Sequence, residues 1–175
     1  NTPCTYIPYS RTDGDGDGDG HSASDPAPLG DPNDDQESAI RVGDEEQLNR
    51  ALDQGADVHS PINEGLYYIV IMQPLMLTAK LGRTRMVTLL VERGADVHWQ
   101  NELGGTAVCV AAEFGHVDVV RLLAELGANV ETPMNDGATP VFIAAQQGHV
   151  EVVSVLAELG ANVKTPKNDG ATPVY

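Results

Sequence analysis

Cysteines and basic residues are both scarce in this chain of 175 residues. The two cysteines are Cys4 and Cys109. Two thiols cannot form the disulfide framework of a small secreted domain or supply a four-ligand metal site. We therefore expect a reducing compartment, with a cytoplasmic localisation as the default, and no metal site.

Basic residues number 10 against 26 acidic residues, which leaves a formal net charge of −16. Residues 1–38 hold nine acids and one arginine, a net charge of −8, and residues 39–175 hold 17 acids and nine basic residues, also −8. Nucleic acids and anionic membrane surfaces attract basic patches, so the composition disfavours both as partners. A basic protein partner fits the composition better.

Long hydrophobic runs are missing as well. The apolar run over 66–77 has 12 residues, with Gln73 and Pro74 inside it, whereas a transmembrane helix needs about 20 apolar residues. The run is too short and too interrupted to predict a membrane span.

Patterns that carry catalysis are missing too. The sequence has no phosphate-binding glycine loop with a lysine, no serine elbow, no Cys-x-x-Cys and no pair of acids suited to a pocket. His59 and His98 are 39 residues apart, without other ligand-type residues beside them. We therefore expect neither an enzyme, nor a cofactor, nor a small-molecule substrate.

A repeat of 33 residues is what the sequence does contain. Residues 135–167 agree with residues 102–134 at 20 of 33 aligned positions. The opening letters, NDGATPV, return at 168–174. A fixed period of this length predicts a stacked array, in which neighbouring units bury the apolar faces that one unit cannot bury alone.

The spacing within the unit predicts two short helices and an arm. Thr139 followed by Pro140 suits a helix start, because the hydroxyl caps a free backbone N–H and proline is tolerated in the first turn. The first helix is expected over 141–147, ending at Gly148, the second over 150–159, and an extended arm with a turn over 161–170. The apolar stripe of the second helix consists of Val152, Val153, Leu156, Ala157 and Leu159.

The letters TPVFIAA at 139–145, GHVEVVSVL at 148–156 and GANV at 160–163 resemble the ankyrin repeat. The resemblance covers residues 35–175. It implies an all-α ankyrin-repeat solenoid of helix-turn-helix units with projecting β-hairpin arms. The resemblance also implies that the arms and the first helices form a concave surface for protein recognition.

The repeat register divides the chain. We expect a disordered tail rich in Asp, Gly and Pro over 1–33 and an ankyrin-repeat array over 34–175. The array would hold repeat 1 at about 34–66, repeat 2 at about 67–101, repeat 3 at 102–134, repeat 4 at 135–167 and a truncated repeat 5 at 168–175. A chain that begins without Met and stops inside a repeat is expected to be a fragment, with repeat 4 uncovered and frayed around Val152 and Leu156.

The tail contains a DGDGDGDG run at 13–20. Asp13, Asp15, Asp17 and Gly18 fall where an EF-hand loop requires them, but Ser24 replaces the bidentate glutamate and no helices are expected beside the run. A solvated acidic linker is the favoured interpretation, with weak calcium association as the alternative.

Repeat 1 and its arm depart from the pattern. Residues 38–42 can form the remnant of a first helix and 44–52 a second one, and Glu45, Asn49 and Asp53 indicate the polar outward face of an N-terminal cap. Gly55 and Gly94 are 39 residues apart instead of 33, so six extra residues lengthen the arm within 60–72. The stretch LYYIVI at 66–71 is either a strand packed on the array or an exposed apolar feature for a partner.

Comparison between the copies assigns roles to single residues. Cys109 is expected in the core, and His116 and His149 are expected to make structural hydrogen bonds where second helices begin. Positions that change between copies are the candidate partner-binding residues. They are Lys80, Leu81, Glu113, Phe114, Gln146 and Gln147 at the ends of first helices, and Trp99, Gln100, Leu103, Met134, Asn135, Asp136 and Lys167 on the arms.

These residues indicate a protein–protein interaction module that binds a partner protein on the concave face. Trp99 and Phe114 are the expected anchors, because buried aromatic residues tend to dominate interfaces. For Trp99, packing on the neighbouring arm is an equal alternative. The alternative function is a targeting or substrate-recruitment arm of a larger enzyme or channel whose functional domain lies outside these residues.

Overall fold

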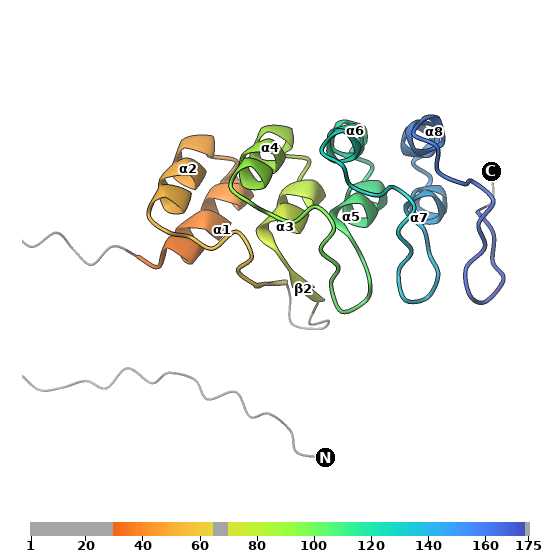
Figure 1. The fold of residues 1–175 in the computed structure, drawn as a ribbon, viewed down its shortest axis with the longest axis horizontal. Coiled ribbons are helices and arrows are strands. Elements are labelled where there is room, and N and C mark those ends of the chain that lie inside the picture. Colours follow the sequence, from red (N-terminus) through yellow and green to blue (C-terminus); the bar gives the residue numbers. More distant parts are fainter. Residues whose placement is uncertain (1–29, 65–69, 174–175) are drawn as a thin grey trace, which may run out of the picture.

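The chain forms a row of helix pairs with loops projecting from one side (Figure 1). The computed structural model describes residues 30–64 and 70–173. Within them the helices are α1 (Pro32–Val42), α2 (Glu45–Asp53), α3 (Pro74–Lys80), α4 (Thr84–Glu92), α5 (Ala107–Glu113), α6 (Val117–Glu125), α7 (Pro140–Gln147) and α8 (Val150–Glu158). Two strands, β1 (Ile62–Glu64) and β2 (Val70–Met72), lie between α2 and α3. The predicted all-α solenoid is confirmed.

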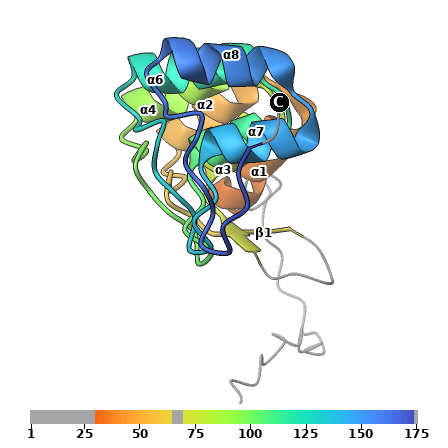
Figure 2. The same ribbon diagram turned by 90° about the vertical axis from the view of Figure 1, so that its right-hand side faces the viewer.

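The helices form two layers. The first helices of the pairs, α1, α3, α5 and α7, contact one another in sequence order, and so do the second helices, α2, α4, α6 and α8 (Figures 1 and 2). The arms project on the side of the first helices. First helices are covered by neighbours on several sides, and α5 accordingly buries every residue from Ala107 to Ala112. The second helices cover them from one side only and are amphipathic.

The predicted helix ends of repeat 4 are confirmed. Thr139 caps α7 with its hydroxyl, which accepts a hydrogen bond from the backbone N–H of Phe142 at 3.3 Å, and Pro140 is the first helical residue. Gly148 ends the helix in the left-handed conformation, with a φ of 79°. Thr106 caps α5 in the same way. The start of these first helices is therefore encoded locally.

The stripe of α8 differs from the prediction. Val152 and Leu156 are 1% and 0% exposed, so the expectation that they lie on an uncovered side of repeat 4 is wrong. α8 packs on α6 and α7, and both side chains belong to the hydrophobic core. Ala157 and Leu159 are exposed instead, and the buried residue that the prediction missed is Val155.

The first helix is longer than the remnant predicted over 38–42. α1 begins at Pro32, which places Pro32 and Asn33, expected in the disordered tail, in the folded array. The Asp31 carboxylate accepts a hydrogen bond from the Asn33 backbone N–H at 2.9 Å, and the Asn33 side-chain oxygen accepts one from the Asp57 backbone N–H at 2.9 Å. A local cap and a contact from the end of repeat 1 together extend the helix.

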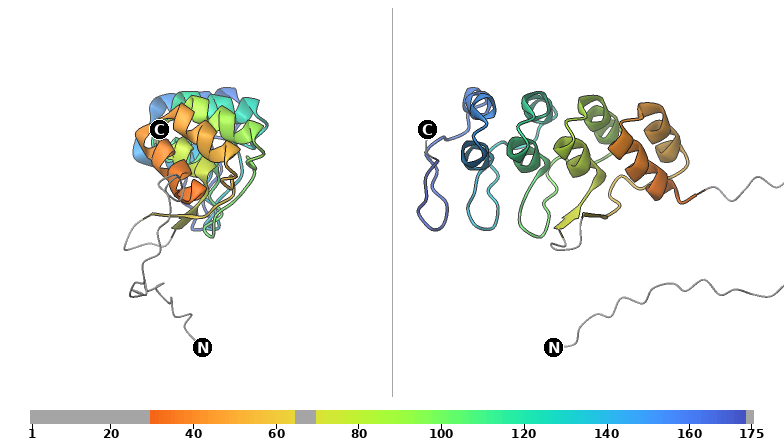
Figure 3. Two further views of the ribbon diagram at one scale, coloured as in Figure 1. Left: turned by 90° about the vertical axis from the view of Figure 1, so that its left-hand side faces the viewer. Right: turned by 180° about the vertical axis from the view of Figure 1, so that it is seen from behind.

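The polar face of α2 is turned toward repeat 2. Asp53 Oδ1 lies 3.0 Å from Arg93 Nη1, Glu45 Oε2 lies 3.8 Å from Arg85 Nη1, and Asn49 Oδ1 accepts a hydrogen bond from Arg93 at 3.0 Å. Glu45 and Asp53 remain exposed, as expected for the polar face of the cap, but they also pair with arginines of repeat 2. Arg85 belongs to α4 and Arg93 is its C-cap residue, so these contacts join the second helices of repeats 1 and 2. Figure 3 shows α1 and α2 at one end of the stack.

The lengthened arm contains the hairpin of β1 and β2. The strands are antiparallel, with Ile62 opposite Met72, and β1 is labelled beside the lower ends of the arms in Figure 2. Of the stretch 66–71, residues 70 and 71 belong to β2, and 66–69 lie outside the described residues. The tail over 1–29, with its DG run and Cys4, also lies outside them.

Candidate functional site

Consecutive repeats are joined near the helix turns by Arg83, His116 and His149, which we call the turn ladder. Each residue follows the glycine behind a first helix, and its side chain reaches a backbone carbonyl at the end of the preceding first helix. The distances are 3.4 Å from Arg83 Nη2 to Val42 O, 2.8 Å from His116 Nε2 to Lys80 O and 3.0 Å from His149 Nε2 to Glu113 O. A carbonyl oxygen only accepts, so Nε2 of each histidine donates. The predicted structural role of both histidines is confirmed.

Glycines leave room for the turn ladder. Gly82 and Gly115 have φ of 70° and 78°, and a Cβ atom at either position would lie 2.8 Å from the imidazole of the histidine in the next repeat. Gly148 has a φ of 79°, but nothing lies within 4 Å of such an atom. The first two glycines therefore provide both a backbone conformation and space, and Gly148 provides the conformation alone.

The arms are joined by Asn135 and Asn168, which we call the arm ladder. Asn135 Nδ2 donates to Glu102 O at 2.8 Å, and its backbone N–H donates to Leu103 O at 2.9 Å. Asn168 makes the same two hydrogen bonds on the next arm. Its Nδ2 donates to Asn135 O at 3.1 Å, and its backbone N–H donates to Asp136 O at 3.0 Å. The side-chain donor of Asn135, a predicted partner-binding residue, is thus used within the array.

Between the first helices and the arms lies a groove of about 580 Å³, which we call the concave groove. One wall comes from α3, α5 and α7, and the other from β2 and the three following arms. Nine of the candidate residues line it: Lys80, Leu103, Glu113, Phe114, Met134, Asp136, Gln146, Gln147 and Lys167. The candidates Leu81, Trp99, Gln100 and Asn135 do not line it.

Apolar residues that the sequence comparison had not marked also line the groove. They include Met72, Val110 and Ile143. Apolar residues inside a short helix look like core, and Val110 is indeed only 6% exposed. Val110 and Ile143 stand three residues before Glu113 and Gln146. Residues at this spacing share a helix face, so the spacing could have identified both.

Two exposed apolar side chains face the groove from opposite walls. Leu103 on an arm is 49% exposed, and Phe114 at the end of α5 is 43% exposed. Among residues 30–62 and 71–173, the large exposed apolar side chains are Val42, Leu103, Phe114, Val150 and Leu159. Only these two of the five line the concave groove, so the groove gathers apolar surface from both of its walls.

The charged groups of the groove differ in the interactions that they already make within the chain. Lys167 Nζ lies 2.7 Å from Asp136 Oδ2. This hydrogen bond lowers the pKa of Asp136 below its ordinary value and raises the pKa of Lys167. Lys80 Nζ lies 5.4 Å from the centre of the Phe114 ring, within the range of a cation–π interaction. Glu113 is exposed, and its carboxylate has no hydrogen bond or ion pair within the described part of the chain.

Two other singled-out residues pack inside the array. Trp99 is half-buried against the hydrophobic core, whereas the packing alternative had placed it on the neighbouring arm. Cys109 is 3% exposed. Burial raises the pKa of its thiol, so the thiol stays protonated and unreactive at neutral pH.

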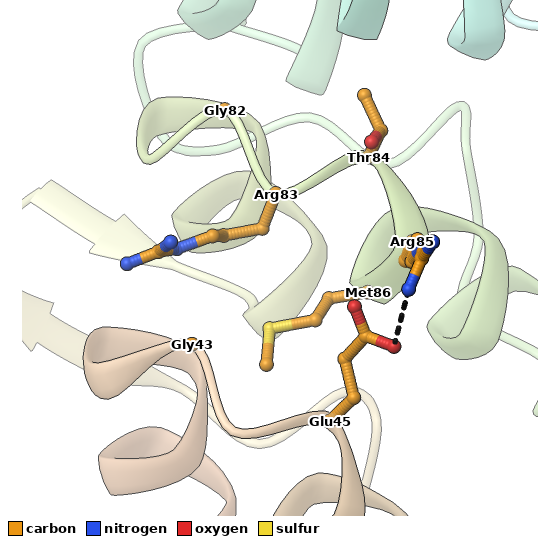
Figure 4. Close-up of a pocket in the computed structure, with 7 residues that line it drawn as sticks. All are labelled: Gly43, Glu45, Gly82, Arg83, Thr84, Arg85 and Met86. Atoms are coloured by element: carbon orange, nitrogen blue, oxygen red, sulfur yellow. Dashed lines mark ion pairs between the residues drawn. The ribbon is translucent and has the colours of Figure 1, made fainter.

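A smaller cleft of about 230 Å³ lies between the turns of repeats 1 and 2. Figure 4 shows that Arg83 and Arg85 point in different directions there, with Arg85 Nη1 3.8 Å from Glu45 Oε2. Arg83 belongs to the turn ladder. The two guanidinium groups therefore do not converge on a common anion.

The described residues contain neither a cluster of metal ligands nor a helix that could span a membrane. Within 30–64 and 70–173, no group of three or more His, Cys, Asp or Glu side chains is placed to hold a metal ion. None of the helices over the same residues is long and apolar enough to cross a membrane.

Comparison with known protein families identifies a family for most of the chain. A family model described as ankyrin repeats (three copies) matches residues 38–133 and 75–167. The matched residues run from within α1 to the arm that follows α8. No curated protein matches the chain. The family resemblance inferred from the 33-residue unit is confirmed.

Proposed function

Because this chain belongs to the ankyrin-repeat family, we propose that it binds a segment of a partner protein in the concave groove. Ankyrin repeats are in general protein–protein interaction modules. The proposal adds the place of binding and the residues that contact the partner.

The observation that carries the proposal is the pair of exposed apolar side chains on opposite walls. Leu103 and Phe114 expose apolar surface toward the same space, beside Met134 and Ile143. The volume of about 580 Å³ falls within the range of about 300–1,000 Å³ that is typical of binding pockets. An apolar side chain of a partner would lose its water-exposed surface between these walls.

The walls are also held in place before a partner binds. The turn ladder connects the ends of the first helices, and the arm ladder connects the arms through backbone and side-chain hydrogen bonds. Rigid walls lower the entropy that is lost on binding. This favours the groove as a preformed site.

Selection of phage-displayed random dodecapeptides on the immobilised chain tests the proposal, followed by fluorescence anisotropy of the enriched peptides. We expect Phe114→Ala to weaken binding roughly 30-fold, the effect of losing an anchor worth about 2 kcal/mol. Leu103→Ala, on the opposite wall, should weaken the same peptides in the same direction.

Val150→Ala is the matched control. Val150 is 73% exposed and lies at the start of α8, outside the groove, so its removal should leave the affinity unchanged. Thermal unfolding would verify that all three variants keep the fold. A library that yields no ligand, or ligands that bind Phe114→Ala as tightly as the wild type, would contradict binding in the concave groove.

A further inference from the structure

We infer that the segment bound in the concave groove presents an apolar side chain next to a lysine or arginine, whose positive charge faces the Glu113 carboxylate. This inference rests on the proposed function, because it names the chemistry of the partner for that same groove. Its basis is the order and the pairing of the charges on the helix wall.

The helix wall carries a different charge in each repeat. Residues 33 positions apart occupy equivalent places, so Lys80, Glu113 and Gln146 form one row along the groove. The row is positive in repeat 2, negative in repeat 3 and neutral in repeat 4. A charged ligand group therefore meets different surroundings at each repeat.

Glu113 is the charged member of this row that is left to a partner. Lys80 lies over the Phe114 ring, and on the opposite wall Lys167 is paired with Asp136 at 2.7 Å. The Glu113 carboxylate is exposed, without a hydrogen bond or ion pair among the residues that the structure describes. A ligand cation can approach it without displacing an existing partner.

The net charge of the chain acts in the same direction. At −16, the field of the protein attracts cationic segments and repels anionic ones before contact. Charge complementarity of this kind sets the on-rate and the choice of partner more than the final affinity. A carboxylate beside Glu113 would be disfavoured both by this field and by the local charge.

The apolar contact must lie close to the charged one. Glu113 and Phe114 are consecutive residues at the end of α5, and both line the groove. A ligand side chain that contacts Phe114 therefore has its neighbours within reach of Glu113. The recognised feature is a short apolar-basic sequence rather than a basic patch spread over a large surface.

Parallel selections of the same dodecapeptide library on wild type, Glu113→Lys and Glu125→Lys test the inference. Glu125 is an exposed residue at the end of α6, in the helix layer away from the arms (Figure 1). Its substitution makes the same change in net charge outside the groove. We expect wild type and Glu125→Lys to enrich Lys or Arg beside a large apolar residue, and Glu113→Lys to enrich Asp or Glu there.

Affinities of single enriched peptides give the second readout. A basic peptide should bind Glu113→Lys about fivefold or more weakly at low salt, and Glu125→Lys within about twofold of wild type, because a local charge pair outweighs a remote charge. The inference would be overturned if the enriched peptides lacked basic residues, or if Glu113→Lys and Glu125→Lys had equal effects on affinity. In either case Phe114→Ala would still weaken binding, so the proposed function would stand. Peptides that ignore Phe114→Ala would instead overturn the proposed function.

Discussion

The turn ladder and the arm ladder both join one repeat to the next, but they differ in depth. The residues of the turn ladder are half-buried, and the hydrogen bond of His116 is itself part-buried, whereas those of Arg83 and His149 are exposed. All three donate to carbonyls at the ends of first helices, where a helix leaves its last carbonyls without intrahelical donors. The asparagines of the arm ladder are exposed, so water competes for their hydrogen bonds. We therefore expect the turn ladder to stabilise the array more than the arm ladder does.

The two ladders also differ in how far they extend. Arg83 replaces histidine in repeat 2 and still reaches the carbonyl of Val42, so the turn ladder continues to repeat 1. On the arms, Glu102 occupies the place of Asn135 and Asn168. A carboxylate has no donor, and the arm before it is the hairpin of β1 and β2. A ladder of hydrogen bonds tolerates a change of residue only if the donor is kept.

The largest expected effect comes from Gly115→Ala, with Gly148→Ala as its control. Both should lose about 1–2 kcal/mol of unfolding free energy, because both impose a left-handed conformation on alanine. Gly115→Ala should lose about 1 kcal/mol more, since its methyl group displaces His149 and its hydrogen bond. Urea unfolding measures both. Equal losses would show that the imidazole moves aside without cost.

His116→Ala removes one bond of the turn ladder. It should cost about 1–2 kcal/mol of unfolding free energy, because the carbonyl of Lys80 loses its donor in a half-buried site. His98, an exposed histidine on an arm, is the control, and His98→Ala should stay within about 0.5 kcal/mol of wild type. If His98→Ala is as destabilising as His116→Ala, the turn ladder is not the source of the effect.

Asn135→Asp should have the smallest effect, about 0.5–1 kcal/mol, because it removes the exposed side-chain donor of the arm ladder. Asn129→Asp makes the same change where the side chain only accepts, from the Glu131 backbone N–H at 2.8 Å. At the equivalent place on the preceding arm, the Asp96 carboxylate accepts the corresponding hydrogen bond from the His98 backbone N–H. Asn129→Asp should therefore leave the unfolding free energy in urea unchanged. A loss as large as that of Asn135→Asp would assign both effects to charge alone.

Much of the helix pattern was predictable because its signals are local. Thr139 and Pro140 mark a helix start and Gly148 marks its end, and each acts through backbone groups within a few residues. The Asp31-Pro32 start of α1 has the same chemistry, but the residues before it have the composition of a disordered tail. Composition therefore predicted the wrong boundary, and the local cap determines the right one.

The orientation of side chains between repeats was not predictable in the same way. Glu45 and Asp53 face repeat 2 because arginines about 40 residues away stand opposite them, and Trp99 packs on the core rather than lining the groove. Variation between copies did mark nine of the groove residues, because the ends of first helices and the arms are free of core packing. It could not mark Met72 or Ile143, whose apolar character resembles that of the core.

The sequence by itself determined the repeat, its helix ends and its family, since these depend on a 33-residue period and on contacts within one unit. Only the tertiary structure decided which variable residues share one groove, which charges are already paired and which side of each helix is covered. Those properties depend on residues from neighbouring repeats, and distances between repeats follow from stacking rather than from any single unit. The repeat in the sequence therefore established the scaffold, and the stacking of unlike copies established the candidate binding site.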